Sequence, residues 1–370
     1  MSETRDAVRA AVLNEPGRLD LETLWVDRPG PREVRVRPAA VGLCHSDLHY
    51  IDGTHTTELP EVLGHEAAGI VESIGELVTS VEVGDHVVTS LTMFCGRCRY
   101  CTSGRMSLCS ERAGLRRRPR PAVVTSEGTP VGVMGGIGAF AELAVVHENA
   151  VTRIPRDLPL RIGSLFGCAV LTGVGAVTRA ARVPVGATVA VVGCGGIGLA
   201  VVQGAVLSGA SRIVAIDRSA AKLDAALAFG ATDALTSDAS TAERLEELVS
   251  GGVDFSFEAV GRAETAELAF GLLAPGGTCT VLGMVPDETP IRVPASALYF
   301  EERRLQGAFI GSSRFTSDVP ELIELYQQGR LVLDPLVTHT FGLEQINEGF
   351  GVLSSGEALR VVLDMPPART

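Results

Sequence analysis

A chain of 370 residues exceeds the usual size of one folding unit, so the sequence predicts two domains, each with its own core. A composition of 46% hydrophobic and 21% charged residues excludes a disordered chain. The net charge of −12 opposes binding to a polyanion such as DNA or to an acidic membrane surface, which leaves small molecules as the expected ligands.

The first eleven residues mix acidic and basic side chains and lack the apolar core of a signal peptide. No apolar run reaches the length of a membrane span, so we expect a cytoplasmic protein with no membrane partner. In a reducing compartment the eight cysteines are expected to stay thiols or to bind metal.

Residues 7–151 contain short β-branched runs broken by Gly and Pro, such as 33–37 and 84–88, which predict an irregular β-rich domain. Within it, the basic run Arg116, Arg117, Arg118 and Arg120 could meet the anionic tail of a substrate. A solvated loop is the interpretation that the sequence favours for this run.

Beyond residue 168 the pattern changes to strands that alternate with helices, which is typical of βαβ units. The predicted strands are 188–192, 212–216, 253–257 and 278–282, and the predicted helices are 197–208 and 220–229. Two more helices at 319–328 and 345–354 and a strand at 360–363 follow. We expect a nucleotide-binding domain at 170–309, inserted into a first domain formed by 1–169 and 310–370.

Four cysteines lie in one short segment with the spacing C-x2-C-x2-C-x7-C, namely Cys95, Cys98, Cys101 and Cys109. Four thiolates complete the tetrahedral shell of zinc and leave no open position, so this spacing predicts a structural zinc. An iron–sulfur cluster takes the same ligands, and four unligated thiols are the remaining interpretation.

The predicted strand 188–192 leads directly into a G-x-G-x-x-G run, Gly193-Cys194-Gly195-Gly196-Ile197-Gly198. A second strand ends at Asp217, about 20 residues further on, as in dinucleotide-binding βαβ units. Asp217 can accept hydrogen bonds from ribose hydroxyls and would repel a 2′-phosphate, so NAD is favoured over NADP, although Arg218 weakens that preference. A tight turn that binds no nucleotide is the other interpretation.

Several motifs in the same order resemble the zinc-containing medium-chain alcohol dehydrogenases, and the resemblance covers essentially the whole chain. The motifs are 64–69 (Gly-His-Glu-Ala-Ala-Gly), the four-cysteine segment, 193–198 and 255–262. The resemblance implies an α/β protein built from a GroES-like β-rich catalytic domain and a Rossmann domain with a doubly wound parallel sheet.

The resemblance also implies a catalytic zinc held by Cys44, His65 and Cys168, with a fourth position open to the alcohol. Two zinc ions per chain are therefore expected. Glu66 is expected beside this metal, and Asp47 is expected to orient His65. A structural salt bridge for Glu66 and an exposed turn for Asp47 are the alternatives.

Ser46 and His49 match the family's proton relay to solvent, and further positions match its cofactor contacts. Those cofactor positions are His45, Thr172, Gly193, Gly195, Gly196, Ile197, Gly198, Asp217, Arg218, Lys222, Val260, Met284 and Arg360. A surface position without function is the alternative for Lys222 and Arg360.

The substrate pocket implied by the resemblance is mostly apolar, which suits a hydrophobic primary alcohol (aliphatic, allylic or aryl) or its aldehyde. Its expected residues are Ser46, His55, Leu91, Phe140, Met284 and Phe309. Gly53 and His55 stand where formaldehyde dehydrogenases that use a thiol adduct carry acidic residues, which argues against that substrate.

Three other possibilities stay open: a dehydrogenase that keeps its NADH bound, a zinc-free reductase and a redox-sensing nucleotide-binding protein. The zinc-free reductase lacks these ligands, and a sensor is expected to have lost some of them. The long loop between Cys109 and Phe140 favours a homodimer, with 278–285 and 291–298 as the segments that pair strands between subunits.

Overall fold

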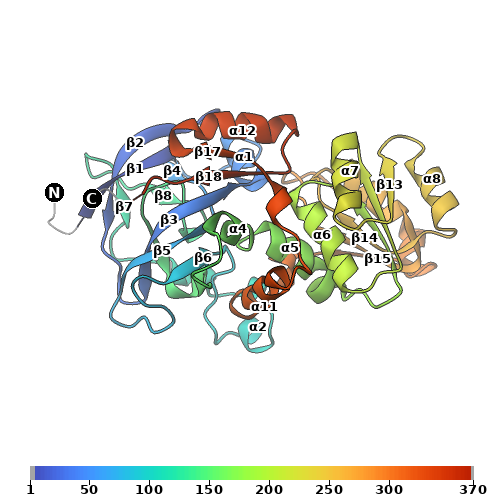
Figure 1. Ribbon diagram of the computed structural model, residues 1–370, viewed down its shortest axis with the longest axis horizontal. Helices are drawn as coiled ribbons and strands as arrows, with labels where there is room; N and C mark the ends of the chain where they lie inside the picture. The colour runs from blue at the N-terminus through green and yellow to red at the C-terminus, as the bar shows by residue number, and fades with distance from the viewer. Residues whose placement is uncertain (1–4, 368–370) are drawn as a thin grey trace. The chain divides into compact units, whose positions relative to one another are not determined.

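The computed structural model describes residues 5–367, which form two compact units (Figure 1). Unit 1 comprises Met1–Cys168, Arg314–Leu325 and Leu333–Thr370, and unit 2 comprises Ala169–Ser313 and Tyr326–Val332. The C-terminal part of the chain thus rejoins the first unit, which is the two-domain α/β organisation that the sequence predicts.

Two short segments belong to unit 2 although the sequence placed them in the first domain. Residues 310–313 pack on the first helix of unit 2, where a Cβ at Gly175 would lie 2.8 Å from the carbonyl oxygen of Gly311. The segment Tyr326–Val332 is bonded to Gln203 of unit 2. The side-chain amide of Gln203 donates to the carbonyl oxygen of Val332 (3.0 Å) and accepts from the backbone N–H of Val332 (2.7 Å). These contacts join residues that are far apart in the sequence, so no local sequence pattern predicts them.

Unit 1 is built on two sheets that enclose one core. The first has the order β7-β2-β1-β4-β8, and the second has the order β10-β6-β5-β3-β18-β17, with β9 on the edge of β3. Along the first seven residues of β3 half-buried and buried positions alternate, as expected where one face of a sheet meets the core, and the last four residues are all buried. The strands are β1 (Arg5–Leu13), β2 (Asp20–Asp27), β3 (Glu33–Leu43), β4 (Glu61–Val62), β5 (Glu66–Ile74), β6 (His86–Thr89), β7 (Val123–Val124), β8 (Gly132–Val133), β9 (Ala144–His147), β10 (Val151–Arg153), β17 (Val337–Gly342) and β18 (Arg360–Asp364).

The helices of unit 1 are mostly short, and α12 lies along β17 and β18 (Figure 1). It ends at Gly356, whose φ of 78° is the left-handed conformation that commonly closes a helix. The helices are α1 (His45–Ile51), α2 (Arg99–Thr102), α3 (Arg112–Leu115), α4 (Leu160–Leu165), α11 (Phe315–Gln327), whose last two residues belong to unit 2, and α12 (Ile346–Ser355).

Unit 2 contains a six-stranded sheet of order β13-β12-β11-β14-β15-β16 in which every pair is parallel. Its central strands are continuous apolar runs because helices cover both faces of such a sheet. The strands are β11 (Thr188–Val192), β12 (Arg212–Asp217), β13 (Asp233–Thr236), β14 (Val253–Glu258), β15 (Leu273–Val281) and β16 (Arg304–Gly307). The helices are α5 (Ala169–Gly175), α6 (Gly196–Leu207), α7 (Ala220–Ala228), α8 (Thr241–Leu248), α9 (Ala263–Gly271) and α10 (Ala295–Tyr299).

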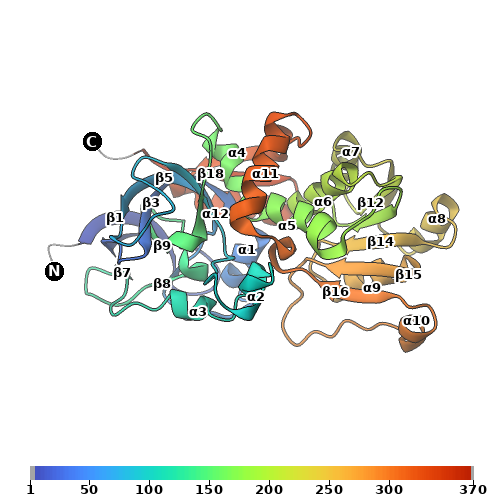
Figure 2. The ribbon, with the colours of Figure 1, turned by 90° about the horizontal axis from the view of Figure 1, so that it is seen from below.

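The segments 278–285 and 291–298, which were expected to pair strands between subunits, are mostly not strands in the structure. β15 ends at Val281, and residues 282–294 form no strand. The chain then enters α10, which lies at one end of this irregular stretch (Figure 2). Pro286, Pro290 and Pro294 interrupt the segment, and proline cannot donate to a strand ladder. No helix among residues 5–367 is long and apolar enough to cross a membrane.

Candidate active site and metal centres

The four cysteines of the C-x2-C-x2-C-x7-C segment converge on one point of unit 1. Their sulfur atoms are 3.5 Å (Cys98–Cys101), 3.9 Å (Cys95–Cys101) and 4.0 Å (Cys98–Cys109) apart. A tetrahedron with Zn–S bonds of about 2.3 Å has edges of about 3.8 Å. The sulfur positions therefore fit a four-coordinate zinc ion.

Backbone amides around this cluster point at the sulfur atoms. Cys95 Sγ accepts from the N–H groups of Arg97 (3.4 Å) and Cys98 (3.2 Å), and Cys109 Sγ accepts from the N–H of Cys95 (3.3 Å). Burial and the neighbouring Cys98 raise the pKa of Cys101 to about 12, whereas hydrogen bonds lower the pKa of Cys98 to about 5. A cation bound between the sulfur atoms favours the thiolate form of all four.

A second group of ligand atoms meets in the same unit. Cys44, His65, Glu66 and Cys168 each place one ligand atom within 4.8 Å of the others, and all four side chains are buried. His65 Nε2 has no hydrogen-bond partner in the described chain, although it is buried at the centre of the group. A buried imidazole nitrogen beside two thiols is the donor set of a catalytic zinc.

Asp47 ties together the two segments that carry Cys44 and His65. Cys44 caps the N-terminus of α1, and its N–H donates to Asp47 Oδ2 (3.3 Å). Asp47 Oδ1 accepts from the N–H of Gly64 (3.0 Å) and lies 3.2 Å from His65 Nδ1. The carboxylate thus fixes the ring so that Nε2 faces the thiols.

The electrostatics of this group favour a cation. A hydrogen bond with Cys168 holds the pKa of the Cys44 thiol well below its ordinary value, against the effect of burial. Burial lowers the pKa of His65, but the charge and hydrogen bond of Asp47, together with Cys44, raise it to about 10. The surroundings of His65 Nε2 and the two thiols therefore stabilise a positive charge, and a divalent metal ion bound there would supply that charge.

The two carboxylate oxygens of Glu66 face different partners, one towards Arg360 and the other towards the ligand His65. Oε2 forms an ion pair with Arg360, and Oε1 lies 4.0 Å from His65 Nε2 with no hydrogen-bond partner among the described residues. Both Glu66 and Arg360 are buried. The contact of Arg360 with a pyrophosphate, expected from the sequence, stays a prediction. Its pairing with Glu66 is the structural salt bridge that was the alternative for Glu66, although the sequence did not indicate the partner.

Three other residues position this site and were missed by sequence reasoning. Thr89 Oγ1 donates to the carbonyl of His65 (2.9 Å) and accepts from the N–H of Ala67 (3.1 Å). A Cβ at Gly167, just before Cys168, would lie 2.4 Å from the Thr89 carbonyl oxygen, and one at Gly42 would lie 2.5 Å from Glu66 Oε2. A single Thr or Gly carries no sequence signal for such a role.

We predict that Asp47→Asn weakens zinc binding at this site about 10- to 100-fold, because the amide cannot accept all three hydrogen bonds of the carboxylate with the same strength. Competition with a chelator, followed by metal analysis, measures the change. Asp52→Asn is the matched control, since Asp52 is exposed at the other end of α1. Equal metal retention in the two variants would contradict the role of Asp47.

α1 also carries the two expected relay residues. Ser46 Oγ lies 3.6 Å from Cys44 Sγ, and His49 is on the same helix, three residues further on. The His49 ring packs against His55 with their centroids 5.5 Å apart. The structure therefore brings Ser46, His49 and His55 together near the ligand Cys44.

The glycines of unit 2 perform three different roles in the turn from β11 to α6. Gly193 has a φ of 96°, and a Cβ there would lie 2.6 Å from Val260. A Cβ at Gly198 would lie 1.8 Å from the Gly193 carbonyl oxygen, so only glycine allows this packing. Gly195, by contrast, has nothing within 4 Å, which leaves open space at the N-terminus of α6 for a phosphate.

Asp217, at the end of β12, faces this turn. Its carboxylate accepts from the N–H groups of Cys194 (2.8 Å) and Ser219 (2.9 Å). The arrangement holds an anionic group where the adenosine ribose of a dinucleotide lies in this fold. Arg218 next to it is exposed, and Lys222 on α7 is half-buried.

The other expected cofactor positions of unit 2 are distributed over its loops and two of its helices. Thr172 lies on α5 next to Gly173, where a Cβ would lie 2.6 Å from the carbonyl oxygen of Ile197 on α6. Val260 is exposed (44%), and Met284 is half-buried. Phe309, which was expected in the substrate pocket, is also exposed (45%). His45 of unit 1 is exposed at the start of α1.

The expected pocket residues of unit 1 are not equivalent. His55 is buried and Leu91 half-buried beside Gly135. Phe140 is fully buried, packs edge-on against Phe350 and would lie 2.6 Å from a Cβ at Gly64. This corrects the expectation for Phe140: it supports the turn that carries His65 from within the core.

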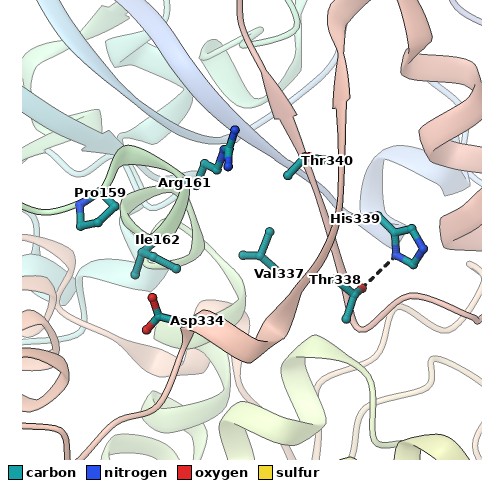
Figure 3. Close-up of a pocket in the computed structure, with 8 residues that line it drawn as sticks. All are labelled: Pro159, Arg161, Ile162, Asp334, Val337, Thr338, His339 and Thr340. Carbon is teal, nitrogen blue, oxygen red and sulfur yellow. Dashed lines mark hydrogen bonds between the residues drawn. The ribbon is translucent and has the colours of Figure 1, made fainter.

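A hollow of about 370 Å³ lies elsewhere in unit 1, between α4 and β17 (Figure 3). Its cation, Arg161, is neutralised by two hydrogen bonds to Asp364 (2.7 and 2.6 Å). Figure 3 shows the His339 ring pointing away from Arg161 and bonded to Thr338. The residues that line this hollow do not form a recognisable catalytic or ligand-binding group.

Comparison with known proteins identifies both halves of the chain. Residues 30–156 match the alcohol dehydrogenase GroES-like domain, and residues 196–328 match the zinc-binding dehydrogenase domain. Putative alcohol dehydrogenase D of Mycobacterium tuberculosis is 40% identical over 362 residues, covering 96% of this chain and 98% of the relative. An NDMA-dependent alcohol dehydrogenase of Amycolatopsis methanolica is 37% identical over 363 residues, covering 96% of this chain and 98% of the relative.

Among solved structures, benzyl alcohol dehydrogenase from Acinetobacter calcoaceticus superimposes with a TM-score of 0.90 at 32% identity, covering 98% of this chain and all of the other. The two converging ligand sets, the glycine turn before α6 and these relatives agree. The chain therefore belongs to the zinc-containing medium-chain alcohol dehydrogenases.

Proposed function

We propose that this protein transfers hydride reversibly between a hydrophobic primary alcohol and NAD, and that it holds two zinc ions per chain. The convergence of Cys44, His65 and Cys168 in unit 1, with Ser46 and His49 beside them, is the observation that carries the proposal. A zinc ion bound there supplies a Lewis acid that eases deprotonation of an alcohol, and NAD supplies the hydride acceptor.

The chain's own residues hold the alcohol proton and pass it to water. Ser46 Oγ, next to Cys44, is the group that accepts the proton first. His49 carries it onward, because burial lowers the pKa of its imidazole and keeps the ring a neutral acceptor near pH 7. His49 Nδ1 has no hydrogen-bond partner within the described chain, which leaves it available for this transfer.

We predict that His49→Gln slows alcohol oxidation about tenfold or more at neutral pH and that added imidazole partly restores the rate. In the wild-type protein the rate should fall on acidification through a pKa below the ordinary histidine value, because a protonated ring cannot accept a proton. Steady-state pH profiles of both proteins, with His339→Gln as the control, measure this. Identical pH profiles for His49→Gln and wild type would contradict the role of His49 in the proton relay.

Asp217 supports NAD as the acceptor rather than NADP. We predict that Asp217→Ser raises the KM for NAD about tenfold and allows turnover with NADP, because the repulsion of the 2′-phosphate is lost. Asp224→Ser is the matched control, since Asp224 is exposed on α7 and removes the same charge. An unchanged ratio of the two cofactors' kcat/KM values in Asp217→Ser would argue against this role.

The similar benzyl alcohol dehydrogenase supports a hydrophobic substrate class that includes aryl alcohols. The test is a screen of NAD reduction over aliphatic, allylic and aryl alcohols, with zinc measured per chain in the same preparation. Turnover of apolar primary alcohols with two zinc ions supports the proposal. Two zinc ions and no turnover on any of these alcohols would overturn it.

A second candidate is a dehydrogenase that keeps its nicotinamide bound and passes hydride to an external acceptor, which the NDMA-dependent relative supports. Denaturing the purified protein and analysing the released nucleotides separates the two candidates. Stoichiometric NADH with NDMA-dependent turnover supports this second candidate, whereas nucleotide-free protein that needs added NAD supports the first.

We also propose a homodimer, based on the long loop between Cys109 and Phe140. Because residues 282–294 form no strand, the pairing of strands between subunits would have to use β16 at the edge of the sheet or require a rearrangement of this segment. A mass near four chains in light scattering would overturn the dimer.

A further inference from the structure

Unit 1 contains a hollow of about 350 Å³ that the proposed reaction does not use. Arg116, Arg118 and Arg120 line it, and we call it the arginine pocket. Glu33 is the one carboxylate among its lining residues. A concave site with three guanidinium groups is suited to an anion, since arginine binds carboxylate and phosphate groups in bidentate fashion.

Internal ion pairs account for only part of this positive charge. Arg120 pairs with the buried Asp27 (2.8 Å), and Arg118 pairs with Glu33 (3.3 Å) and approaches Asp27 (3.8 Å). Arg118 Nη1 is buried and has no hydrogen-bond partner in the described part of the chain. Two carboxylates therefore balance two of the guanidinium groups and leave the two N–H groups of Arg118 Nη1 without a partner in the described part of the chain.

Arg116 is the cation that remains. It is exposed, and none of the ion pairs within 4.0 Å among residues 5–367 involves it, while the charge of Glu61 acts on its pKa from a greater distance. Its side chain rests on Gly136, where a Cβ would lie 3.1 Å from Arg116 Cγ and 3.2 Å from Nε. Gly136 also lines the arginine pocket and has a φ of 79°, so glycine at this position keeps room for the guanidinium.

Apart from the arginines, Glu33 and His147, the side chains that line the arginine pocket are apolar. Met93, Val131 and Val145 line it and are each at least nine-tenths buried, which means that a bare inorganic ion would leave their side of the hollow unfilled. A ligand with an apolar body and an anionic head matches both sides. We propose that the arginine pocket binds the carboxylate of an organic acid whose apolar body packs on these three side chains.

Two sources could supply this carboxylate. Leu91 and Arg116 approach the same residue, since a Cβ at Gly135 would lie 2.0 Å from Leu91 Cδ2 and 3.9 Å from Arg116 Nη2. If Leu91 lines the alcohol site, as the family resemblance implies, the carboxylate is the tail of the substrate of the proposed function. Otherwise it belongs to a separate acid that binds beside the active site.

The binding test uses octanoate, with octanamide as the uncharged control, on the zinc-loaded protein. Trp25, the single tryptophan of the chain, lies on β2 opposite Val124 and two residues from Asp27, so its fluorescence reports on this region. We expect saturable quenching or enhancement with octanoate and none with octanamide. Calorimetry gives the same Kd independently of the fluorescence.

Arg116→Ala should weaken octanoate binding about tenfold or more, because a hydrogen bond to a charged group is lost. Arg116→Lys should recover part of the affinity without bidentate contact. Arg117→Ala is the matched control: it removes the same charge one residue away and does not line the arginine pocket. Equal weakening by Arg116→Ala and Arg117→Ala, wild-type affinity in Arg116→Ala, or no saturable binding would each overturn the proposal.

A kinetic arm separates the two sources once an alcohol is known. Octanoate that raises the KM of the alcohol without changing kcat, through a site sensitive to Arg116→Ala, identifies the tail of the substrate. Octanoate that binds without changing the KM identifies a separate acid. Both results agree with a carboxylate site in the arginine pocket. The binding test needs no turnover, so a failure of this proposal can be distinguished from a failure of the proposed function.

Discussion

His65→Ala should leave the protein with one zinc ion per chain instead of two and should lower kcat/KM for an alcohol about a thousandfold or more. The ring is one of three buried ligands, and a zinc Lewis acid contributes several kcal/mol to such a reaction. Metal analysis by mass spectrometry and steady-state kinetics on the same preparation measure both effects.

His339→Ala is the control for this variant, because His339 lies on β17 and takes no part in either ligand set. The thermal transition distinguishes loss of metal from loss of fold, since the four-cysteine cluster is untouched in both variants. Two zinc ions and wild-type turnover in His65→Ala would refute the assignment of the catalytic metal.

Cys98→Ser should release the other zinc and unfold the segment around the four cysteines. This segment contains only α2 and α3, each of four residues, and the 3-10 helix Met106–Leu108, so little regular structure remains without the metal. Structural zinc binding contributes about 10 kcal/mol or more to folding in small zinc-binding domains, and the thermal transition should fall accordingly.

Trypsin provides a local measurement of the same effect. Arg97 and Arg99 are exposed within the segment, and cleavage there should become fast in Cys98→Ser while the metal-loaded protein resists. Cys194→Ser is the control, because Cys194 is a buried thiol whose pKa burial raises to about 12. Unchanged zinc content and cleavage in Cys98→Ser would show that the cluster does not hold a metal.

The fold of unit 2 follows closely from local sequence patterns. β11 begins and ends where the apolar run 188–192 predicts, and α6 begins and ends one residue earlier than the predicted 197–208. Buried parallel strands and a glycine turn leave strong patterns, because each depends on residues close together in sequence. The two-residue strands β4 and β8 leave none.

The ligand sets were also predictable, whereas the contacts that position them were not. Four cysteines within fifteen residues indicate a metal by spacing alone, and Cys44, His65 and Cys168 follow from the family resemblance. The pairing of Glu66 with Arg360 joins residues 294 positions apart, and no pattern in the chain relates them. Phe140 shows the same limit, since sequence cannot separate an apolar residue of the core from one that lines a pocket.

The return of residues 326–332 to unit 2 limits how this protein can be divided or recombined. A fragment of 169–313 would lack Val332, which satisfies both polar ends of the buried Gln203 amide. Leaving a buried amide unsatisfied costs about 1–3 kcal/mol per group. An exchange of nucleotide-binding units between relatives must therefore transfer two separate pieces of the gene, so recombination at a single pair of crossover points is disfavoured.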